Sequence, residues 1–448
     1  MFPSRSKAVR NFSIMTPSAR LKSVLEIFER LEKSKVPMDT TVGDYMRQRK
    51  FIGSKDRANI VDRAYGIIRH WARLGWHIEK AGAEIGPRSL LIAYLALVEN
   101  YDKADDYFDG SKYGPEELSA EEQKLFETLL KAELEPVDMP EAVRLECPPE
   151  YEASLRGYFG DDFVVELKAL QDSAPLDLRI NTTMADVEKV AKKLGEDGVE
   201  TDALTFSPWG LRARGKAFIS KTRAFVKGWI DIQDEGSQLI ALACNARPGL
   251  QVLDYCAGAG GKTLALANAM KIKGRIVAMD LEDARLQKGR ERFRRAHVSD
   301  IIELRPLSDE RHRKWLRRQK ETFDVVLTDV PCSGTGTWRR NPDMRWRRFG
   351  PDLAELLTIQ SEIMDKVAHT VKPGGRFVYA TCSILPEENE KQVGAFLERH
   401  KDFRLMPLAE AWPEGAKPPC EGDYMRLTPK RHNTDGFFAA VMQRAANQ

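Results

Sequence analysis

Apolar positions in the first third of the chain recur at helical spacing. Residues at i, i+3, i+4 and i+7 share one face of a helix, so such stripes predict helices that pack on their apolar sides. The first stripe follows Ser18, a candidate N-cap, and two more fall within 60–71 and 91–98. The first contains Leu21, Val24, Leu25, Phe28 and Leu31. We therefore expect a helical domain over residues 18–140.

The pattern changes twice further along the chain. Four prolines at 136–149 mark a connection, and short apolar segments then suggest a small α+β domain over 150–233. From 234 onward, runs rich in Val, Ile and Leu alternate with helical stretches, which is typical of a parallel sheet covered on both faces. These runs are Gln251–Cys256, Arg275–Asp280, Ile301–Leu304, Phe323–Asp329 and Arg376–Thr381. We expect a domain over 234–448, with Phe437–Met442 as an edge strand.

Composition limits the classes of protein that remain. The chain has 448 residues, 42% apolar and 31% charged, which is ordinary for a soluble globular protein. No apolar stretch approaches about 18 residues, so no membrane span is expected. Six scattered cysteines without a CxxC pair indicate reduced thiols and a cytoplasmic location. The histidine spacing predicts no metal site, and the first 25 residues form a basic arm.

Positive charge is concentrated between Arg285 and Arg348. Six cations fall within 311–320, and five arginines within 339–348 are interleaved with Trp338, Trp346 and Phe349. Cations that neutralise phosphates, together with rings that stack on bases, suit single-stranded nucleic acid. The alternative for 311–320 is a solvated helix face. We expect 338–349 to act as a clamp on RNA.

A glycine-rich turn follows the first buried run, where open α/β sheets bind ligands. Its glycines allow close backbone approach and positive φ, so we expect it to bind a cofactor. The candidate residues are Cys256, Ala257, Gly258, Ala259, Gly260, Gly261 and Lys262. The stretch also nearly matches the P-loop pattern of nucleotide hydrolases. Cys256 stands in place of the first P-loop glycine, which weakens that alternative.

Two acids close the next buried runs. Asp280 lies 26 residues beyond Asp254, and a carboxylate at that place typically accepts hydrogen bonds from ribose hydroxyls. Asp309 is placed to meet an adenine edge. The structural alternative for each of the two is a helix N-cap.

Two further strand ends carry thiols. Cys332 lies in Asp329-Val330-Pro331-Cys332-Ser333-Gly334, and Cys382 in Ala380-Thr381-Cys382-Ser383. A lone cysteine at a strand end is usually a small buried hydrophobe, but two Cys-Ser pairs at such ends make that interpretation less attractive. Asp329 lies three residues before Cys332 and should share its site. The pattern indicates covalent chemistry beside a bound adenosine cofactor.

These motifs resemble those of the NOL1/NOP2/Sun family of RNA (cytosine-5)-methyltransferases, especially its bacterial small-subunit rRNA branch. The likeness covers roughly 175–448. It implies an α/β, class I (Rossmann-like) S-adenosylmethionine-dependent methyltransferase domain, preceded by a small α+β (RRM-like) domain and an N-terminal helical (NusB-like) domain. Gly258-Ala259 departs from the usual Ala-Pro, which questions the loop's rigidity. The matching motifs are Cys256–Thr263, Asp329–Gly336, Thr381–Ser383 with Pro386–Glu390, and His432–Phe438.

The resemblance also implies a mechanism and partners. Cys382 is the expected nucleophile toward carbon 6 of cytosine and Cys332 assists resolution, while Asp329 stabilises the adduct and also borders the cofactor. Lys262 holds the base or activates a thiol. In DNA cytosine-5 methyltransferases the cysteine equivalent to Cys332 is the nucleophile, so exchanged roles stay open. The expected substrate is rRNA, with tRNA open, and the expected state is a monomer. An assembly factor that binds RNA without methylating it is a further alternative.

Overall fold

The computed structural model describes residues 15–104 and 106–446, so most of the basic arm lies outside the described residues. By their internal contacts these residues form two units. The first runs to Ala153 and also includes Asn341–Gly350, and the second comprises Ser154–Arg340 and the chain from Pro351 onward. The small α+β part and the large sheet therefore share one unit. No pattern in the sequence predicts that residues 341–350 belong to the first unit. No helix of the described residues is long and apolar enough to span a membrane.

The first unit is helical, and the apolar stripes form its core. Leu21 and Val24 in the first stripe are fully buried, as are Ile60 and Leu91 in the next two. Thr16, rather than Ser18, caps the first helix by accepting from the amide of Ala19. The helices are α1 (Pro17–Lys33), α2 (Met38–Gln48), α3 (Ser54–Arg69), α4 (Trp71–Lys80), α5 (Pro87–Leu97), α6 (Ala120–Leu129) and α7 (Glu141–Arg144).

The aromatic and arginine-rich segment 338–349 is largely buried. In the second unit Trp338 is fully buried and Arg339 is 3% exposed. In the first unit Arg345 is also 3% exposed. Within the first unit, Trp346 packs against the helical core, and Arg347 donates to carbonyl oxygens at the end of α1. The expected RNA clamp is therefore wrong for these side chains. Their rings and cations are used for packing and backbone hydrogen bonds, which composition alone does not reveal.

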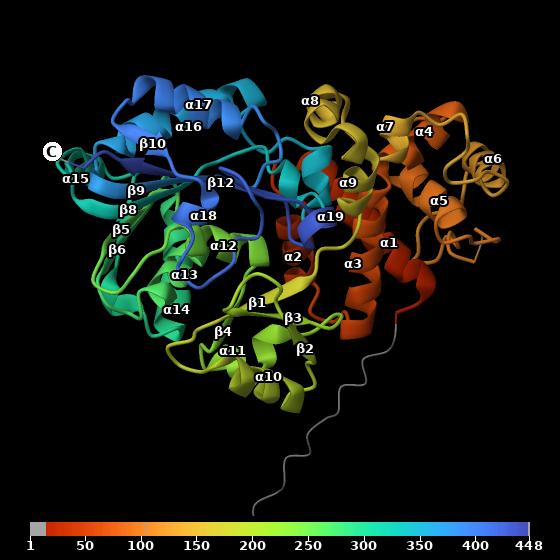
Figure 1. The fold of residues 1–448 in the computed structure, drawn as a ribbon. Coiled ribbons are helices and arrows are strands. Elements are labelled where there is room, and N and C mark those ends of the chain that lie inside the picture. The colour runs from red at the N-terminus through yellow and green to blue at the C-terminus, as the bar shows by residue number, and fades with distance from the viewer. Residues whose placement is uncertain (1–14, 105, 447–448) are drawn as a thin grey trace, which may run out of the picture. The chain divides into compact units, whose positions relative to one another are not determined.

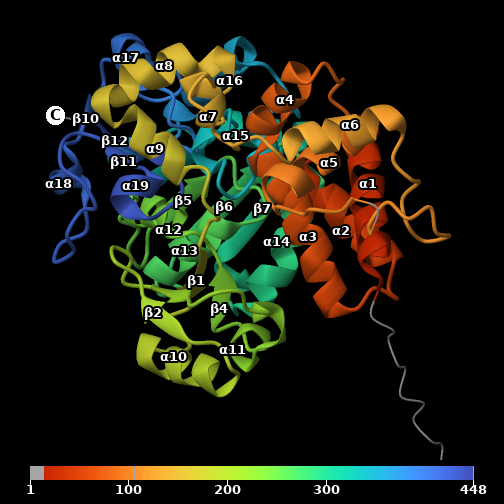
Figure 2. The ribbon, with the colours of Figure 1, turned by 90° about the vertical axis from the view of Figure 1, so that its right-hand side faces the viewer.

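The second unit contains a four-stranded antiparallel sheet. Its strands are ordered β2-β3-β1-β4, which is the order of the ferredoxin-like β-α-β-β-α-β arrangement. Helices α10 and α11 lie together beside it (Figure 2). The bounds are β1 (Leu176–Ile180), α10 (Val187–Glu196), β2 (Thr201–Ala203), β3 (Gly210–Ala213), η2 (Ile219–Lys221), α11 (Arg223–Val226) and β4 (Ile230–Ile232). Before the sheet come α8 (Pro149–Phe159), which spans the division between units, η1 (Gly160–Asp162) and α9 (Phe163–Ala169).

The larger sheet has eight strands, seven of them in the order β10-β12-β9-β8-β5-β6-β7, with β11 pairing β12. Its strands β5 to β9 run parallel, while β12 is antiparallel to β9. The strand expected at the edge, β12, instead lies inside, because β10 pairs with its other side. The bounds are β5 (Gln251–Asp254), β6 (Arg275–Asp280), β7 (Ile302–Pro306), β8 (Phe323–Asp329), β9 (Val371–Thr381), β10 (Phe403–Leu405), β11 (Met425–Leu427) and β12 (Phe437–Arg444).

Helices cover both faces of this sheet, as the buried runs predict (Figure 1). One face packs on α12 (Glu235–Ala243), α13 (Gly261–Ala269) and α14 (Asp283–Arg295), and the other on α15 (Glu310–Arg317), α16 (Leu353–Ala368) and α17 (Glu390–Arg399). The short elements are η3 (Ser299–Ile301), η4 (Thr335–Thr337), η5 (Pro342–Arg345), α18 (Leu408–Ala411) and α19 (Pro429–His432).

Candidate functional site

The two thiols meet at the carboxyl end of adjacent parallel strands. Asp329 on β8 pairs in register with Ala380 on β9, so Cys332 and Cys382 leave the sheet side by side. Their Sγ atoms are 3.4 Å apart. Neither cysteine forms a disulfide, and both residues are partly exposed.

A buried carboxylate fixes the loop that carries Cys332. Glu388, which is fully buried, accepts hydrogen bonds from the Ser333 amide at 2.8 Å and from Gln360 Nε2 at 2.9 Å. The Ser333 hydroxyl also donates to it. Gln360 donates in addition to the carbonyl oxygen of Pro331 at 3.1 Å. The chain after Cys382 therefore holds the chain around Cys332 in place.

Charge around the thiols is arranged asymmetrically. The hydrogen bond with Cys382, followed by burial, raises the pKa of Cys332 well above the usual thiol range. Lys262 interacts electrostatically with Cys382 and lies 2.6 Å from Asp329, measured from Nζ to Oδ2. Burial by itself lowers the pKa of Lys262, but the charge of Asp329 and its hydrogen bond outweigh that effect, and the pKa is raised. A stable cation therefore stands near Cys382, one of the two hydrogen-bonded thiols.

The glycine loop connects β5 to α13. Gly258 and Gly260 have φ of 56° and 76°, a region that favours glycine. The amide of Gly258 donates to Asp280 Oδ2 at 2.8 Å, and that carboxylate also accepts from the amide of Glu282. The loop, in which Gly258-Ala259 stand in place of the usual Ala-Pro, is therefore anchored by Asp280 at the end of β6.

The P-loop alternative is disfavoured by the buried side chain of Thr263. In a P-loop this hydroxyl binds the magnesium ion, but here it is fully buried and donates to Asp254 Oδ2 at 2.7 Å. Burial raises the pKa of Asp254 to about 7. Among the described residues no cluster of His, Cys, Asp or Glu is arranged to hold a metal ion.

The surroundings of Asp280 fit an adenosine cofactor. Leu281, the next residue, is 70% exposed and offers an apolar surface for a base. The guanidinium of Arg285 lies against the loop, since a Cβ at Gly258 would be 2.9 Å from its Nη2. Asp309 is the N-cap of α15, and its carboxylate is engaged by Arg311 at 2.7 Å. Its contact with adenine stays a prediction, as does the ribose contact of Asp280.

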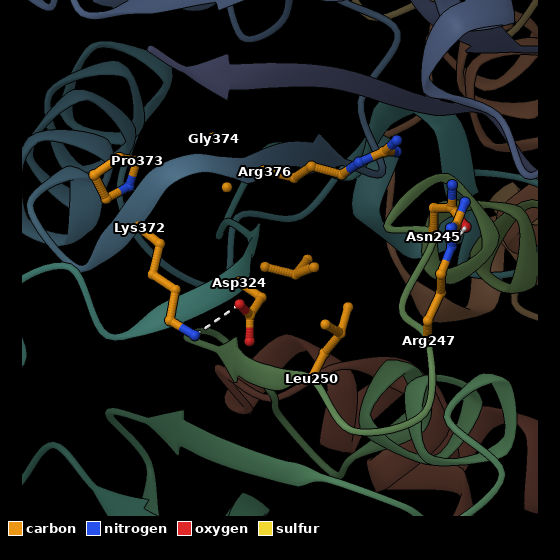
Figure 3. A pocket seen from close by; sticks show the side chains of 10 residues that line it. Asn245, Arg247, Leu250, Asp324, Lys372, Pro373, Gly374 and Arg376 are labelled. Atoms are coloured by element: carbon orange, nitrogen blue, oxygen red, sulfur yellow. Dashed lines mark hydrogen bonds and ion pairs between the residues drawn. The ribbon is translucent and has the colours of Figure 1, made fainter. Parts of the chain in front are cut away.

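A cavity lies at the opposite, amino-terminal edge of the same strands. Its volume is about 370 Å³, and its lining includes Arg247, Asp324, Lys372 and Arg376 (Figure 3). Lys372 is paired with Asp324 at 2.7 Å. Because β8 runs from this cavity to Asp329, the cavity and the thiols lie at opposite ends of the strand. The cavity is therefore separate from the thiol site.

Sequence reasoning missed three residues of this region. Glu388 falls within the Pro386–Glu390 motif, but nothing in the sequence assigns its partner, and Gln360 lies far from it along the chain. Arg285 follows Asp280 by five positions on the next helix. Arg285 lies in the first turn of the helix that follows an expected cofactor acid, and this position is a signal that identifies it from the sequence. No signal in the sequence identifies Gln360.

Comparisons with known proteins place this geometry in a family. A family model described as 16S rRNA methyltransferase RsmB/F matches residues 241–443. A probable ribosomal RNA small subunit methyltransferase B of Synechocystis is 36% identical over 60% of this chain and 60% of its own. The ribosomal RNA small subunit methyltransferase B of Photorhabdus laumondii is 27% identical over 87% of this chain and 91% of its own.

A solved structure shares the fold of a large part of the chain. It is a methyltransferase homolog protein from Pyrococcus horikoshii, 29% identical, with a TM-score of 0.56 over 68% of this chain and 97% of its own. The class I methyltransferase fold is thereby confirmed. The match to a methyltransferase family model supports the expected cofactor, S-adenosylmethionine. Residues 241–443 of this chain therefore form a domain similar to the family described as 16S rRNA methyltransferase RsmB/F.

Proposed function

We propose that this protein forms 5-methylcytosine in small-subunit rRNA through a covalent bond between Cys382 and carbon 6 of the target cytosine. One observation carries the proposal: two partly exposed thiols lie 3.4 Å apart at adjacent strand ends, beside the Lys262–Asp329 ion pair. S-adenosylmethionine, when bound by the glycine loop and Asp280, supplies an electrophilic methyl group.

Carbon 5 of cytosine is a weak nucleophile, and a thiolate changes that. Cys382 Sγ bonds to carbon 6, and the electrons of the carbon 5–carbon 6 double bond become available at carbon 5 for methyl transfer. A base then removes the carbon 5 proton, the double bond forms again, and the bond from sulfur to carbon 6 breaks. Covalent catalysis of this kind divides one difficult step into easier ones.

The charges near the thiols support Cys382 as the nucleophile. The thiolate form is the reactive one, and a neighbouring cation such as Lys262 stabilises it. Cys332, whose pKa is raised well above the usual range, is the thiol that keeps its proton and hydrogen-bonds its neighbour. Cys332 then takes part in resolving the adduct after methyl transfer.

Asp329 is the group that we assign to the edge of the base. Its carboxylate lies at the end of β8 and is 28% exposed in spite of its ion pair with Lys262. An exposed oxygen there accepts a hydrogen bond from the exocyclic amine of cytosine, and Lys262 fixes its orientation. The target base leaves its stack to reach the thiols, which favours single-stranded loops of rRNA.

The test is methyl transfer from labelled S-adenosylmethionine to undermodified small-subunit rRNA. The wild type is compared with Cys382→Ala, Cys332→Ala and, as a matched control, Cys420→Ala, a half-buried cysteine whose sulfur hydrogen-bonds with the backbone of Tyr424 and Arg426. We expect Cys382→Ala to be inactive, and Cys332→Ala to accumulate a protein–RNA adduct that survives denaturation. Cys420→Ala should behave as the wild type.

The remaining outcomes each change a different part of the proposal. An adduct trapped by Cys382→Ala and absent in Cys332→Ala exchanges the two roles. Methylated product that is not 5-methylcytosine, identified by nucleoside mass spectrometry, contradicts the chemistry. Incorporation into tRNA in place of rRNA corrects the substrate. Wild-type protein that binds RNA without methylating any supports the assembly-factor alternative.

A further inference from the structure

The small sheet of the second unit does not offer its open face to RNA. In RRM domains that face carries aromatic side chains on which bases stack. In this sheet the corresponding face carries the charged residues Asp177 and Arg179, which are only 1% and 2% exposed. Asp177 pairs with Arg212 at 2.7 Å, and Asp231 on β4 pairs with Arg292 of α14. The methyltransferase part of the same unit covers this face, so any RNA contact of the small sheet lies elsewhere.

A pocket opens at the helical side of this sheet. Its volume is about 400 Å³, and it lies between the turn after α10 and the segment that leads into α11. Small-ligand sites typically measure about 300–1,000 Å³. Phe218 lines it and is 73% exposed. Val199, which is buried, and Ala217 contribute apolar lining.

The charge of this pocket is positive. Lys216 and Lys221 line it, and Lys221 Nζ lies 6.0 Å from the centre of the Phe218 ring. None of the described carboxylates lies within ion-pair distance of Lys221. Asp197 is the only acid among the lining residues, and its two oxygens accept from Arg223, at 2.6 Å from Nε and 2.7 Å from the backbone amide. The charge of Lys221 is therefore not neutralised by Asp197.

An exposed ring beside two cations suits a nucleotide. Every base has a flat face that stacks on an aromatic side chain, and lysines attract the phosphates on either side. A single exposed phenylalanine needs no explanation by itself. Here the ring, the cavity and the charge of Lys221 coincide, and the enzyme's proposed substrate is a polyanion with unpaired bases.

We propose that the Phe218 pocket binds one unpaired nucleotide of the RNA substrate, with its base stacked on Phe218 and its flanking phosphates against Lys216 and Lys221. The pocket is a binding site separate from the thiol site and holds RNA outside the target cytosine. This inference rests on the proposed function in one respect, that RNA is the substrate. Its test measures RNA binding directly and so does not require methyl transfer.

The test is the affinity of the full chain for a labelled single-stranded RNA, measured by fluorescence anisotropy without cofactor. Phe218→Ala should weaken binding about 5-fold or more, because stacking of one base contributes about 1–3 kcal/mol. Phe218→Trp should restore affinity, since it keeps a stacking face. Because Phe218 is largely exposed, the unfolding midpoint should stay unchanged, which confirms that the variants fold.

Charge and control variants sharpen the result. Lys216→Ala with Lys221→Ala should lower the slope of log affinity against log salt by about 0.7 for each phosphate that the lysines no longer neutralise. Val226→Ala removes another exposed apolar side chain, 67% exposed on α11. Arg247→Ala removes an exposed cation at the distant cavity. Both control variants should bind RNA as the wild type does.

Three results would each overturn the proposal. They are binding of RNA by Phe218→Ala within twofold of the wild type, a tryptophan variant that binds no better than alanine, and a lysine double variant that behaves as Arg247→Ala does. If Phe218→Ala binds RNA weakly while the wild type forms no 5-methylcytosine, the pocket stands and the proposed product fails. If the wild type methylates RNA and Phe218→Ala binds normally, the pocket fails and the proposed function stands.

Discussion

Replacing Glu388 tests whether its buried carboxylate holds the Cys332 loop. The change to alanine removes the acceptor for the Ser333 amide and for Gln360 Nε2, and also for the Ser333 hydroxyl. The change to glutamine keeps one carbonyl oxygen for the two N–H donors. Its new amide group then faces the Ser333 hydroxyl, which can turn and accept.

The expected loss follows from which donors keep a partner. The half-buried Ser333 amide loses its acceptor on the fully buried Glu388 side chain, at a cost of about 1–3 kcal/mol. Gln360 keeps the Pro331 carbonyl, and the Ser333 hydroxyl lies 3.3 Å from Thr335 Oγ1, so each of these losses costs about 0.5–1.5 kcal/mol. Glu388→Ala should therefore lose roughly 2–6 kcal/mol from the lost hydrogen bonds, to which the cavity adds, and Glu388→Gln about 1 kcal/mol.

Urea unfolding of the two variants and the wild type measures these differences. Hydrogen exchange at the Ser333 amide should become faster in Glu388→Ala and change little in Glu388→Gln. Methyl transfer should fall in the same order, because Ser333 directly follows Cys332. If the alanine variant is no less stable than the glutamine variant, the carboxylate does not hold the loop and the reasoning is refuted.

Three further changes test other parts of the structure. Burial raises the pKa of Asp254 to about 7, so between about pH 4, its ordinary value, and pH 7 the folded state keeps a proton that the unfolded chain has released. The contribution of Asp254 to stability falls as pH rises through that window, and Asp254→Asn should lack this slope in urea unfolding across it. Gly336→Ala would place a Cβ 2.1 Å from the carbonyl oxygen of Gly436, so it should destabilise by about 1–3 kcal/mol, measured by thermal unfolding against Gly350→Ala, where the space is open. Thr16→Ala removes the cap of α1 and should cost about 0.5–2 kcal/mol, whereas Thr16→Ser should cost far less in the same assay.

Local pattern was sufficient for the elements that depend on neighbouring residues. The strand ends at Asp329 and Thr381 follow from buried runs next to Pro331 and Ser383, and the glycine loop follows from its own letters. Parallel strands place their carboxyl ends on one edge, which is why two cysteines predicted at strand ends meet in the structure. That the two thiols share one site was therefore predicted before any contact was known, and the chemistry assigned to them stays a proposal.

Residues whose partners lie far along the chain were decided by tertiary structure. Trp338 and Arg345 are residue types expected in a nucleic-acid clamp, yet both side chains are buried. Burial depends on what packs against a side chain and not on its residue type. The place of β12 inside the sheet required β10, whose pairing no local pattern encodes. The hydrogen bonds of Glu388 to Ser333 and Gln360 join three segments. The sequence by itself determined the main elements and the candidate reactive residues, and the tertiary structure decided which side chains pack inward and which partners hold the thiols in place.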